Sequence, residues 1–242
     1  MTSPDKVEPK DKLKVAAIIP AHNEASTIGE VARIAHECGY VDEVIVVDSL
    51  STDDTAALAA AAGARVLTAP APGKGEAMAA GVAATDAEVL LFLDGDLLGL
   101  KVEHLDRLVR TVVKEGATMS CGLFDRGRFL NPIFLKFLPV LTGERALPRK
   151  LFESLEPDDM QGYKIEAALN SRCAEVGGRR VCFVCPGLWH VTKEKKFNPV
   201  EGFLRKTWML AIAIWEYLAY RVRHRRRYRK LAVANARANP KP

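Results

Sequence analysis

Short apolar runs alternate with longer amphipathic or alanine-rich stretches along most of this chain. Apolar runs of about five residues are typical of strands that are buried on both faces, as in a parallel sheet. Strands are expected at residues 15–19, 44–47, 65–67, 89–93, 118–123 and 181–184. Helices are expected at residues 25–38, after an opening turn at 51–54, and at 74–84, 102–115 and 165–176. This alternation predicts an α/β fold, with a mostly parallel sheet flanked by helices.

The strand expected at 89–93 ends on two carboxylates, Asp94 and Asp96, which are separated by Gly95. Open α/β sheets bind their ligands beyond the carboxyl ends of the strands. Alternate residues of an extended chain point the same way, so both carboxylates can approach one hard cation, most simply Mg²⁺ or Mn²⁺. The other interpretation of this pair is a capping or turn role.

Two common nucleotide-binding motifs are absent from the sequence. The turn after the first strand reads Pro-Ala-His-Asn-Glu in place of G-x-G-x-x-G, which disfavours a dinucleotide site. Residues 72–75, Pro-Gly-Lys-Gly, lack the glycine spacing and the following Ser or Thr of a P-loop. Lys74 nevertheless lies between glycines, where the backbone can approach a ligand and the ammonium can meet a pyrophosphate. A solvated loop lysine is the alternative.

Composition indicates one ordinary globular domain with appendages. The chain has 242 residues, of which 48% are hydrophobic and 27% charged. It contains no apolar stretch of about 18 residues that would span a bilayer. Residues 1–12 are polar and mixed in charge, so we expect a disordered N-terminus without a secretory signal, and a cytoplasmic protein.

The C-terminal region carries the positive charge of the chain. Residues 221–242 hold nine Lys or Arg and no acid, which leaves 26 basic against 30 acidic residues before them. Residues 208–220 are apolar and aromatic, so we expect an apolar-then-basic helix over 203–231 and a disordered tail over 232–242. Such a helix suits an anionic membrane surface at the inner face of the cell membrane. Alternatively, it packs on the body or on a second copy of the chain. A mildly acidic body argues against a nucleic-acid partner.

Four motifs occur in order along the first hundred residues: Ile-Ile-Pro-Ala-His-Asn-Glu (18–24), Val-Val-Asp-Ser-Leu-Ser-Thr-Asp-Asp-Thr (46–55), Gly-Lys-Gly-Glu-Ala (73–77) and Asp-Gly-Asp (94–96). Together they resemble the nucleotide-sugar glycosyltransferases of the GT-A fold, in a family 2-like form. Farther along, residues 142–146, 161–166 and then His190 resemble the distal half of glucosyl-3-phosphoglycerate synthase-like enzymes. The resemblance implies a Rossmann-like GT-A domain over 13–202.

The resemblance also implies a donor site for a nucleotide sugar. Its residues would be Pro20, Ala21, His22, Glu24, Asp48, Ser49, Lys74, Asp94, Gly95 and Asp96. A helix-capping role is the alternative for the loops at 20–24 and 48–51. Asp94, Asp96 and His190 would hold the metal ion, which neutralises charge on the departing nucleoside diphosphate.

The remaining implied roles concern catalysis and the acceptor. Lys74, Asp96 and Glu166 are the candidate catalytic residues, and Glu166 could orient or deprotonate an acceptor hydroxyl. A first-turn acid that complements the helix dipole is the alternative for Glu166. Arg128, Gly143 and Arg145 are the candidate contacts of a phosphorylated acceptor, although either arginine could instead be solvent-exposed.

The leading interpretation is therefore a metal-dependent hexosyltransferase. The resemblance implies transfer of glucose from UDP-glucose to a small phosphorylated acceptor such as 3-phosphoglycerate. A polyprenyl- or dolichyl-phosphate glycosyltransferase at the membrane surface is the rival, and the C-terminal region is its main argument. A catalytically inactive nucleotide-sugar-binding protein is the third interpretation.

Overall fold

The computed structural model describes residues 13–127, 131, 142–160 and 164–190. The N-terminus predicted to be disordered, the predicted C-terminal helix at 203–231, the tail at 232–242 and Arg128 all lie outside the described residues. The predictions made for them therefore remain predictions.

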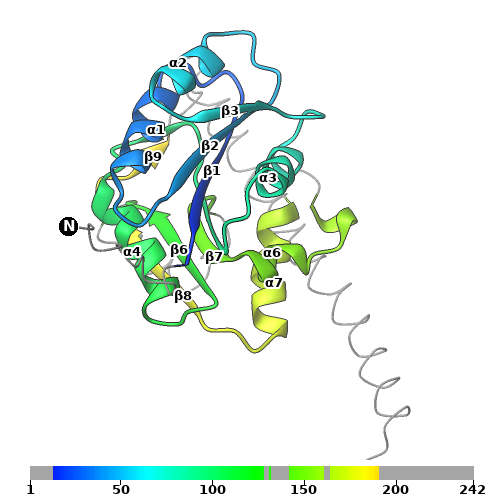
Figure 1. Ribbon diagram of the computed structural model, residues 1–242. Coiled ribbons are helices and arrows are strands. Elements are labelled where there is room, and N and C mark those ends of the chain that lie inside the picture. Colours follow the sequence, from blue (N-terminus) through cyan, green and yellow to red (C-terminus); the bar gives the residue numbers. More distant parts are fainter. Residues whose placement is uncertain (1–12, 128–130, 132–141, 161–163, 191–242) are drawn as a thin grey trace, which may run out of the picture.

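A seven-stranded sheet in the order β3-β2-β1-β4-β7-β6-β8 forms the centre of the molecule (Figure 1). Its strands are β1 (Val15–Ala21), β2 (Glu43–Asp48), β3 (Arg65–Thr68), β4 (Val89–Phe92), β6 (Met119–Phe124), β7 (Arg145–Pro148) and β8 (Arg180–Cys185). Strand β1 pairs in parallel with β2 and β4, β2 with β3, and β6 with β8. The mostly parallel sheet is thus confirmed.

Strand β7 is the exception, because it lies antiparallel between β4 and β6. Its sequence, Arg-Ala-Leu-Pro, contains no apolar run, so the hydrophobic pattern does not predict it. A second, two-stranded sheet joins β5 (Leu97–Leu98) and β9 (Trp189–His190) in antiparallel pairing. This small sheet matters for the site, because it places His190 opposite the chain that directly follows Asp96.

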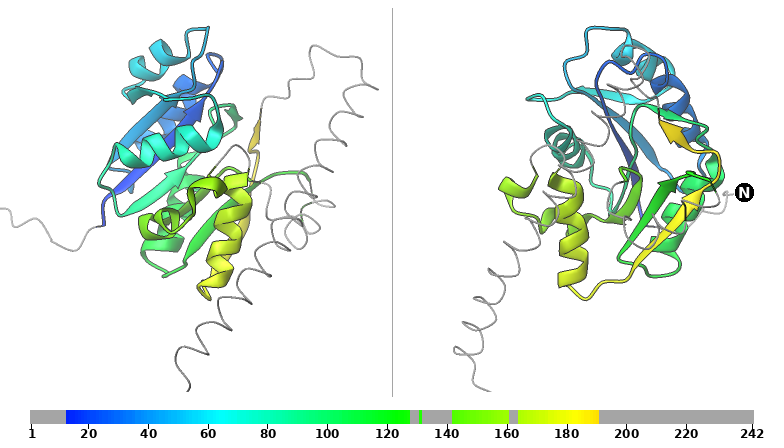
Figure 2. Two further views of the ribbon diagram at one scale, coloured as in Figure 1. Left: turned by 90° about the vertical axis from the view of Figure 1, so that its right-hand side faces the viewer. Right: turned by 180° about the vertical axis from the view of Figure 1, so that it is seen from behind.

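Helices cover both faces of the sheet (Figures 1 and 2). They are α1 (Ile28–Glu37), α2 (Thr55–Ala61), α3 (Lys74–Ala83), α4 (Val102–Val113), α6 (Arg149–Glu153) and α7 (Lys164–Glu175), with a 3₁₀ turn at Pro157–Asp159. Helices α1, α2 and α4 lie on one face, and α3, α6 and α7 on the other, which the left view of Figure 2 turns toward the reader.

Two hydrophobic clusters fill the layers on either side of the sheet. Alternate residues of β1 divide between them: Ala17 and Ile19 pack with α1 and α4, whereas Ile18 packs with α3. Phe92 and Phe152 meet in the second cluster with ring centroids 5.4 Å apart. Each fully buried large apolar side chain contributes about 1.5–3 kcal/mol. This double-sided burial holds the strand ends that carry the site in fixed positions.

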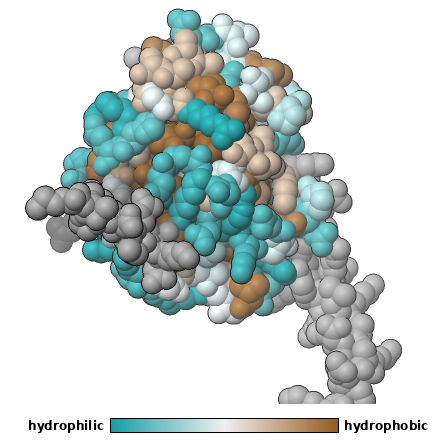
Figure 3. Space-filling model, in the orientation of Figure 1, coloured by the Kyte–Doolittle hydropathy of each residue, from teal (hydrophilic) through white to brown (hydrophobic). Residues whose placement is uncertain are grey.

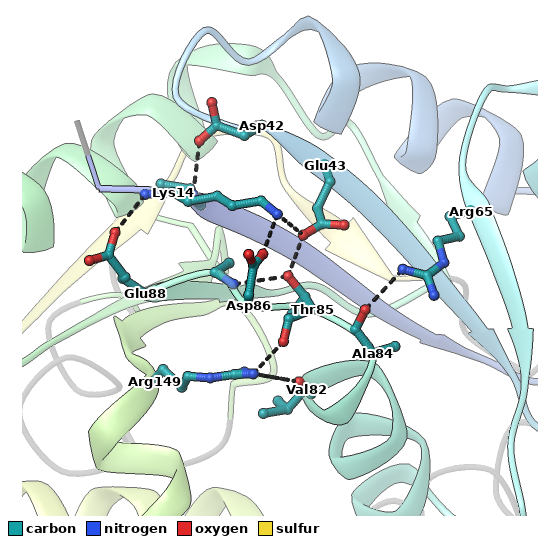
Figure 4. Close-up of polar contacts among 12 residues, drawn as sticks. Lys14, Asp42, Glu43, Arg65, Val82, Ala84, Thr85, Asp86, Glu88 and Arg149 are labelled. Atoms are coloured by element: carbon teal, nitrogen blue, oxygen red, sulfur yellow. Dashed lines mark hydrogen bonds and ion pairs between the residues drawn. The ribbon is translucent and has the colours of Figure 1, made fainter. Parts of the chain in front are cut away.

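A charged network closes the edge at which the parallel strands begin (Figure 4). Lys14 contacts Glu43 at 3.3 Å and also contacts Asp86. These two ion pairs join the starts of β1, β2 and β4. Arg149, at the end of β7, donates to the carbonyl of Val82 at 2.9 Å, near the end of α3. Carbonyls at a helix C-terminus need such donors. These charges lie at the opposite edge from the candidate site and have a structural role.

The face of the molecule shown in Figure 3 is mostly polar. In the orientation of Figure 3, hydrophilic residues cover much of the face, and hydrophobic residues form smaller patches between them. Within the described residues, none of the helices combines the length and apolarity needed to cross a bilayer.

Candidate active site

The carboxyl ends of β1, β2 and β4 gather most of the predicted donor-site residues. Pro20 and Ala21 end β1, and Ala21 is the register partner of Asp48 at the end of β2. The segment Asp94–Asp96 follows β4, which is the other neighbour of β1. The Thr27 hydroxyl donates to the Gly95 carbonyl at 2.7 Å, which ties this segment to the loop before α1. The structure therefore brings these residues to one edge of the sheet.

Hydrogen bonds lock the loops after β1 and β2 together. A ring nitrogen of His22, Nδ1, lies 2.7 Å from the Ser49 carbonyl. The Asn23 amide donates to the Ser51 hydroxyl at 2.9 Å, and the Thr52 amide donates to the Asn23 side chain at 2.8 Å. Because each loop holds the other, the backbone at this edge is preorganised for a ligand.

One carboxylate oxygen of Asp48, between these loops, lacks a hydrogen-bond donor among the described residues. The residue is only 8% exposed, and its Oδ2 accepts a hydrogen bond from the Ser51 amide at 3.3 Å. Its other oxygen, Oδ1, is buried and has no hydrogen-bond partner among the described residues. A buried acceptor without a donor is costly, so this oxygen is suited to accept a hydrogen bond from a ligand.

The Glu24 backbone makes several hydrogen bonds in this structure. Its amide donates to the Thr55 hydroxyl at 2.8 Å, and its carbonyl accepts from the amides of Thr27 at 3.0 Å and Ile28 at 2.9 Å. These contacts begin α1 at Ile28, three residues later than predicted. The Glu24 backbone thus supports the start of α1, and donor binding by its carboxylate stays a prediction.

Lys74 joins two carboxylates from separate elements. Its Nζ lies 2.6 Å from Asp94 Oδ1, after β4, and 2.5 Å from Glu166 Oε1, in the first turn of α7. The Lys74 side chain is only 18% exposed, so the solvated-lysine alternative is wrong. Burial alone lowers the pKa of Lys74, but the charges of Asp94 and Glu166 outweigh it and raise the pKa above its usual value. Lys74 is therefore a firmly charged cation held between two anions.

Gly143 lies directly against the Asp94 carboxylate. A Cβ atom added to Gly143 would fall 2.4 Å from both Asp94 oxygens. The sequence predicted Gly143 as an acceptor contact, and the structure adds a steric reason for glycine: any side chain here would displace Asp94. Gly143 thus helps to set the position of the Asp94 carboxylate relative to Lys74.

Asp96 and His190 lie near the Lys74–Asp94 pair. The pairing of β5 with β9 puts His190 opposite Leu97, and its ring packs on Phe124 with centroids 4.9 Å apart. Burial raises the pKa of Asp96, and the Asp94 charge adds to that effect, whereas His190 and Lys74 lower it. Two carboxylates that repel each other in this way, with an imidazole nearby, fit a hard divalent cation.

The three predicted metal ligands are not gathered into one cluster. Among the described residues, no three His, Cys, Asp or Glu side chains lie close enough together to hold an ion. One of the three, Asp94, is paired with Lys74 instead. Asp96 and His190 remain the better-placed ligands, and the Asp94 oxygen that contacts Lys74, Oδ1, would have to exchange that contact to bind an ion as well.

Arg145 is fully buried, so the solvent-exposed alternative is wrong for it. Its guanidinium donates to the Thr142 carbonyl and, at 3.2 Å, to the carbonyl of Glu166. These bonds hold the start of α7 next to β7 and so help to place the Glu166 side chain. Direct contact between Arg145 and an acceptor stays a prediction that its burial disfavours.

Glu144 is a buried acid that the sequence did not single out. Its side chain is 0% exposed; one oxygen meets the Thr142 hydroxyl, and the other has no partner in the described part of the chain. Burial raises the pKa of Glu144 to about 8, and the charge of Asp94 contributes to the rise. The only sign of it in the sequence was its place in the segment 142–146, which carries part of the family resemblance, between Gly143 and Arg145.

The chain is similar in sequence to known glycosyltransferases. Residues 16–136 match the model of the family described as "Glycosyl transferase family 2". Over 123 residues the chain is 42% identical to glucosyl-3-phosphoglycerate synthase of Mycolicibacterium smegmatis, which covers 46% of this chain and 41% of that protein. It is 30% identical over 184 residues to glycosyltransferase AglJ of Haloferax volcanii, covering 67% and 59% of the two chains. The chain thus spans less than half the length of the first of these relatives.

Solved structures are similar over a larger share of the chain. Glucosyl-3-phosphoglycerate synthase from Mycobacterium tuberculosis, in complex with Mn²⁺, UDP-glucose and phosphoglyceric acid, superposes with a TM-score of 0.62 at 30% identity. That match covers 76% of this chain and 74% of the other. The same enzyme with Mn²⁺, UDP and glucosyl-3-phosphoglycerate gives a TM-score of 0.66 at 28% identity, covering 85% and 80%.

Proposed function

Because this chain belongs to glycosyl transferase family 2, we propose that it transfers glucose from UDP-glucose to a small phosphorylated hydroxy acid such as 3-phosphoglycerate. The observation that carries the proposal is the Lys74–Asp94–Glu166 cluster beside Asp96, at the carboxyl edge of the sheet. The similarity to glucosyl-3-phosphoglycerate synthase, whose structure holds UDP-glucose and phosphoglyceric acid, supports the choice of donor and acceptor.

On the donor side, the chain offers an acceptor for the nucleoside and a cation for the diphosphate. The buried Asp48 Oδ1 would accept a hydrogen bond from the base or the ribose. Lys74 would exchange Asp94 for a diphosphate oxygen, since a diphosphate carries more negative charge than one carboxylate. That exchange would release Asp94 toward Asp96 and His190.

A bound Mg²⁺ or Mn²⁺ ion would stabilise charge on the departing UDP as the sugar–phosphate bond breaks. Asp96 and His190, together with the released Asp94, are the residues that would hold it. Structures of glucosyl-3-phosphoglycerate synthase from Mycobacterium tuberculosis contain Mg²⁺ with UDP, and Mn²⁺ with UDP-glucose.

On the acceptor side, Glu166 is the residue that we propose to meet the acceptor hydroxyl. Lys74 orients its carboxylate through the 2.5 Å contact, and Arg145 holds its backbone carbonyl. From this position Glu166 would bind the acceptor hydroxyl and, in the transition state, take up or share its proton. Arg128 remains the predicted partner of the acceptor phosphate and lies outside the described residues.

The central test compares Asp96→Ala with Asp86→Ala. Asp86 is 82% exposed and belongs to the network at the opposite edge, so its loss controls for the removal of a carboxylate. We expect the wild type and Asp86→Ala to bind UDP in calorimetry when Mn²⁺ is present. In a separate assay with UDP-glucose as the donor, both should produce UDP only when 3-phosphoglycerate is added. Asp96→Ala should lose both. Unchanged UDP binding by Asp96→Ala would refute the metal assignment.

A donor and acceptor screen tests the substrate assignment separately. Thermal shifts with UDP-, GDP- and dTDP-sugars should single out UDP-glucose, and release of UDP should then depend on a phosphorylated hydroxy acid. Activity on a polyprenyl phosphate alone would favour the rival function. Three predictions remain: a cytoplasmic location, association with a second copy of the chain, and membrane binding by residues 208–230. Membrane binding can be tested by comparing the vesicle flotation of the full-length protein with that of a protein ending at Phe203.

A further inference from the structure

Asp125, the residue after β6, joins three segments of the chain, one of which leads to His190. Its Oδ1 accepts hydrogen bonds from the Gly127 amide and the Asn131 side chain, both at 3.0 Å. Its Oδ2 accepts from the Gly187 amide at 3.3 Å, and its own amide donates to the Leu188 carbonyl at 3.2 Å. One carboxylate thus connects the end of β6, the loop that follows it, and the turn that leads into β9.

The turn held by Asp125 packs tightly against the rest of the site. Gly187 has a φ of +74°, a conformation that favours glycine. Its carbonyl oxygen would lie only 2.1 Å from a Cβ atom added to Gly99, so these two backbones approach as closely as glycines allow. Leu188 is fully buried, and its amide donates to the Cys185 carbonyl at 3.1 Å. The turn therefore has one well-defined position, two residues before His190.

The residue before Asp125 contacts His190 directly. The Phe124 ring packs on the His190 ring with a centroid separation of 4.9 Å and an interplanar angle of 49°. Consecutive residues thus support the same short segment: Phe124 touches the imidazole, and Asp125 holds the turn that carries it. The pairing of His190 with Leu97 completes the support next to Asp96.

From this arrangement we propose that Asp125 is a positioning residue for His190, which it holds beside Asp96 by anchoring the turn at residues 185–188. The consequence for metal binding rests on the proposed function, whereas the positioning itself does not. A purely local role would need only the Gly127 contact, two residues away. The bond to Gly187 spans 62 residues of sequence and has no local purpose.

The first test needs no metal and no substrate. Ring-current shifts from Phe124 should displace the His190 imidazole protons in the NMR spectrum of wild-type protein, and Phe124→Leu identifies that signal by abolishing the displacement. We expect Asp125→Ala to move the same protons toward the values of an unstructured histidine, and Asp125→Asn, which keeps one acceptor oxygen, to move them less.

Asp42→Ala is the matched control, because Asp42 Oδ2 likewise accepts a hydrogen bond from a distant backbone amide, that of Val15, at 2.9 Å. It should leave the His190 signals in place. Unshifted His190 signals in folded Asp125→Ala, or equal shifts in both alanine variants, would overturn the proposal. If Asp125→Ala does not fold, the Asp125→Asn variant provides the test. His190 signals that do not move at all in Asp125→Asn would then overturn the proposal.

The second test measures Mn²⁺ affinity in the presence of UDP by calorimetry. Loss of a residue that orients a metal ligand typically weakens binding by about 10–100-fold. We expect about a tenfold loss for Asp125→Ala and none for Asp42→Ala; equal affinities for wild type and Asp125→Ala would refute the consequence for metal binding. If wild-type protein bound neither Mn²⁺ nor UDP while the NMR result held, the proposed function would fail and the positioning role would stand.

Discussion

Replacing Gly143 by alanine should disable the site through a single added methyl group. The new Cβ would lie 2.4 Å from both oxygens of Asp94, whereas ordinary contacts begin at 3.4 Å. The Asp94 carboxylate must therefore retreat by roughly 1 Å, the difference between these two distances. Retreat is not free, because Lys74 holds that carboxylate at 2.6 Å.

The size of the effect follows from this overlap. Misplacing a catalytic group by about 1 Å can cost about 100-fold in rate, so we expect kcat/KM for UDP release to fall by that order. Overpacking of this kind also destabilises a protein by about 1–3 kcal/mol. For a chain of this length, that lowers Tm by only about 2–12 °C, since each kcal/mol corresponds to about 2–4 °C. Activity should thus fall far more than stability.

Gly39→Ala is the control, because a Cβ there would meet nothing within 4 Å. Kinetics of UDP release, calorimetry with UDP and Mn²⁺, and thermal unfolding should be measured for both variants. Values for folded Gly143→Ala that match those of Gly39→Ala would show that the Asp94 carboxylate does not lie where the structure has it, or that its position does not matter. Either outcome refutes the reasoning.

Other predictions address stability and pH. Because the pKa of Glu144 rises from 4.5 to about 8 on folding, its stabilising contribution is fully present below pH 4.5 and is lost as the pH rises through 8. Urea unfolding should show wild type losing on the order of 2 kcal/mol between pH 6 and 8.5 from this group, and Glu144→Gln losing less; parallel curves would contradict this. Leu50 has a φ of +58° and is 51% exposed, so its backbone is strained while its side chain is half in solvent. Leu50→Gly should therefore raise the free energy of unfolding by about 0.5–1 kcal/mol. A decrease would show that the contacts of the Leu50 side chain stabilise the fold by more than its backbone strain costs. Arg149→Ala removes the donor to the carbonyls of Val82 and Thr85 and should lower the free energy of unfolding by about 1–3 kcal/mol, with kcat unchanged; a loss of kcat without a loss of stability would argue against a structural role.

The hydrophobic pattern was sufficient to predict most of the sheet. Strands at 15–19, 44–47 and 89–93 were predicted within two residues of β1, β2 and β4, because an apolar run marks a segment buried on both faces wherever it ends up. Their polar ends followed too, since the carboxyl ends of parallel strands share one edge. That is why Asp48 and Asp94 could be assigned to the same region from sequence.

The pairings within the site were decided only by the tertiary structure. Lys74 and Glu166 are 92 residues apart in sequence, and nothing in the pattern around either residue specifies the other. Strand β7 inserts antiparallel beside β4 without an apolar run of its own, and this insertion buries Arg145 and Glu144 and puts Gly143 against Asp94. His190 reaches the site through a two-residue strand.

The division has a physical cause. Local sequence determines which face of a segment avoids water, because helices and strands repeat with fixed periods. It does not determine which charge meets which, because that depends on how segments distant in sequence pack and on the desolvation of each group once they do. In this protein the hydrophobic pattern predicted the parallel strands and the sheet edge that carries the chemistry, whereas long-range packing inserted β7 and put Lys74 between Asp94 and Glu166.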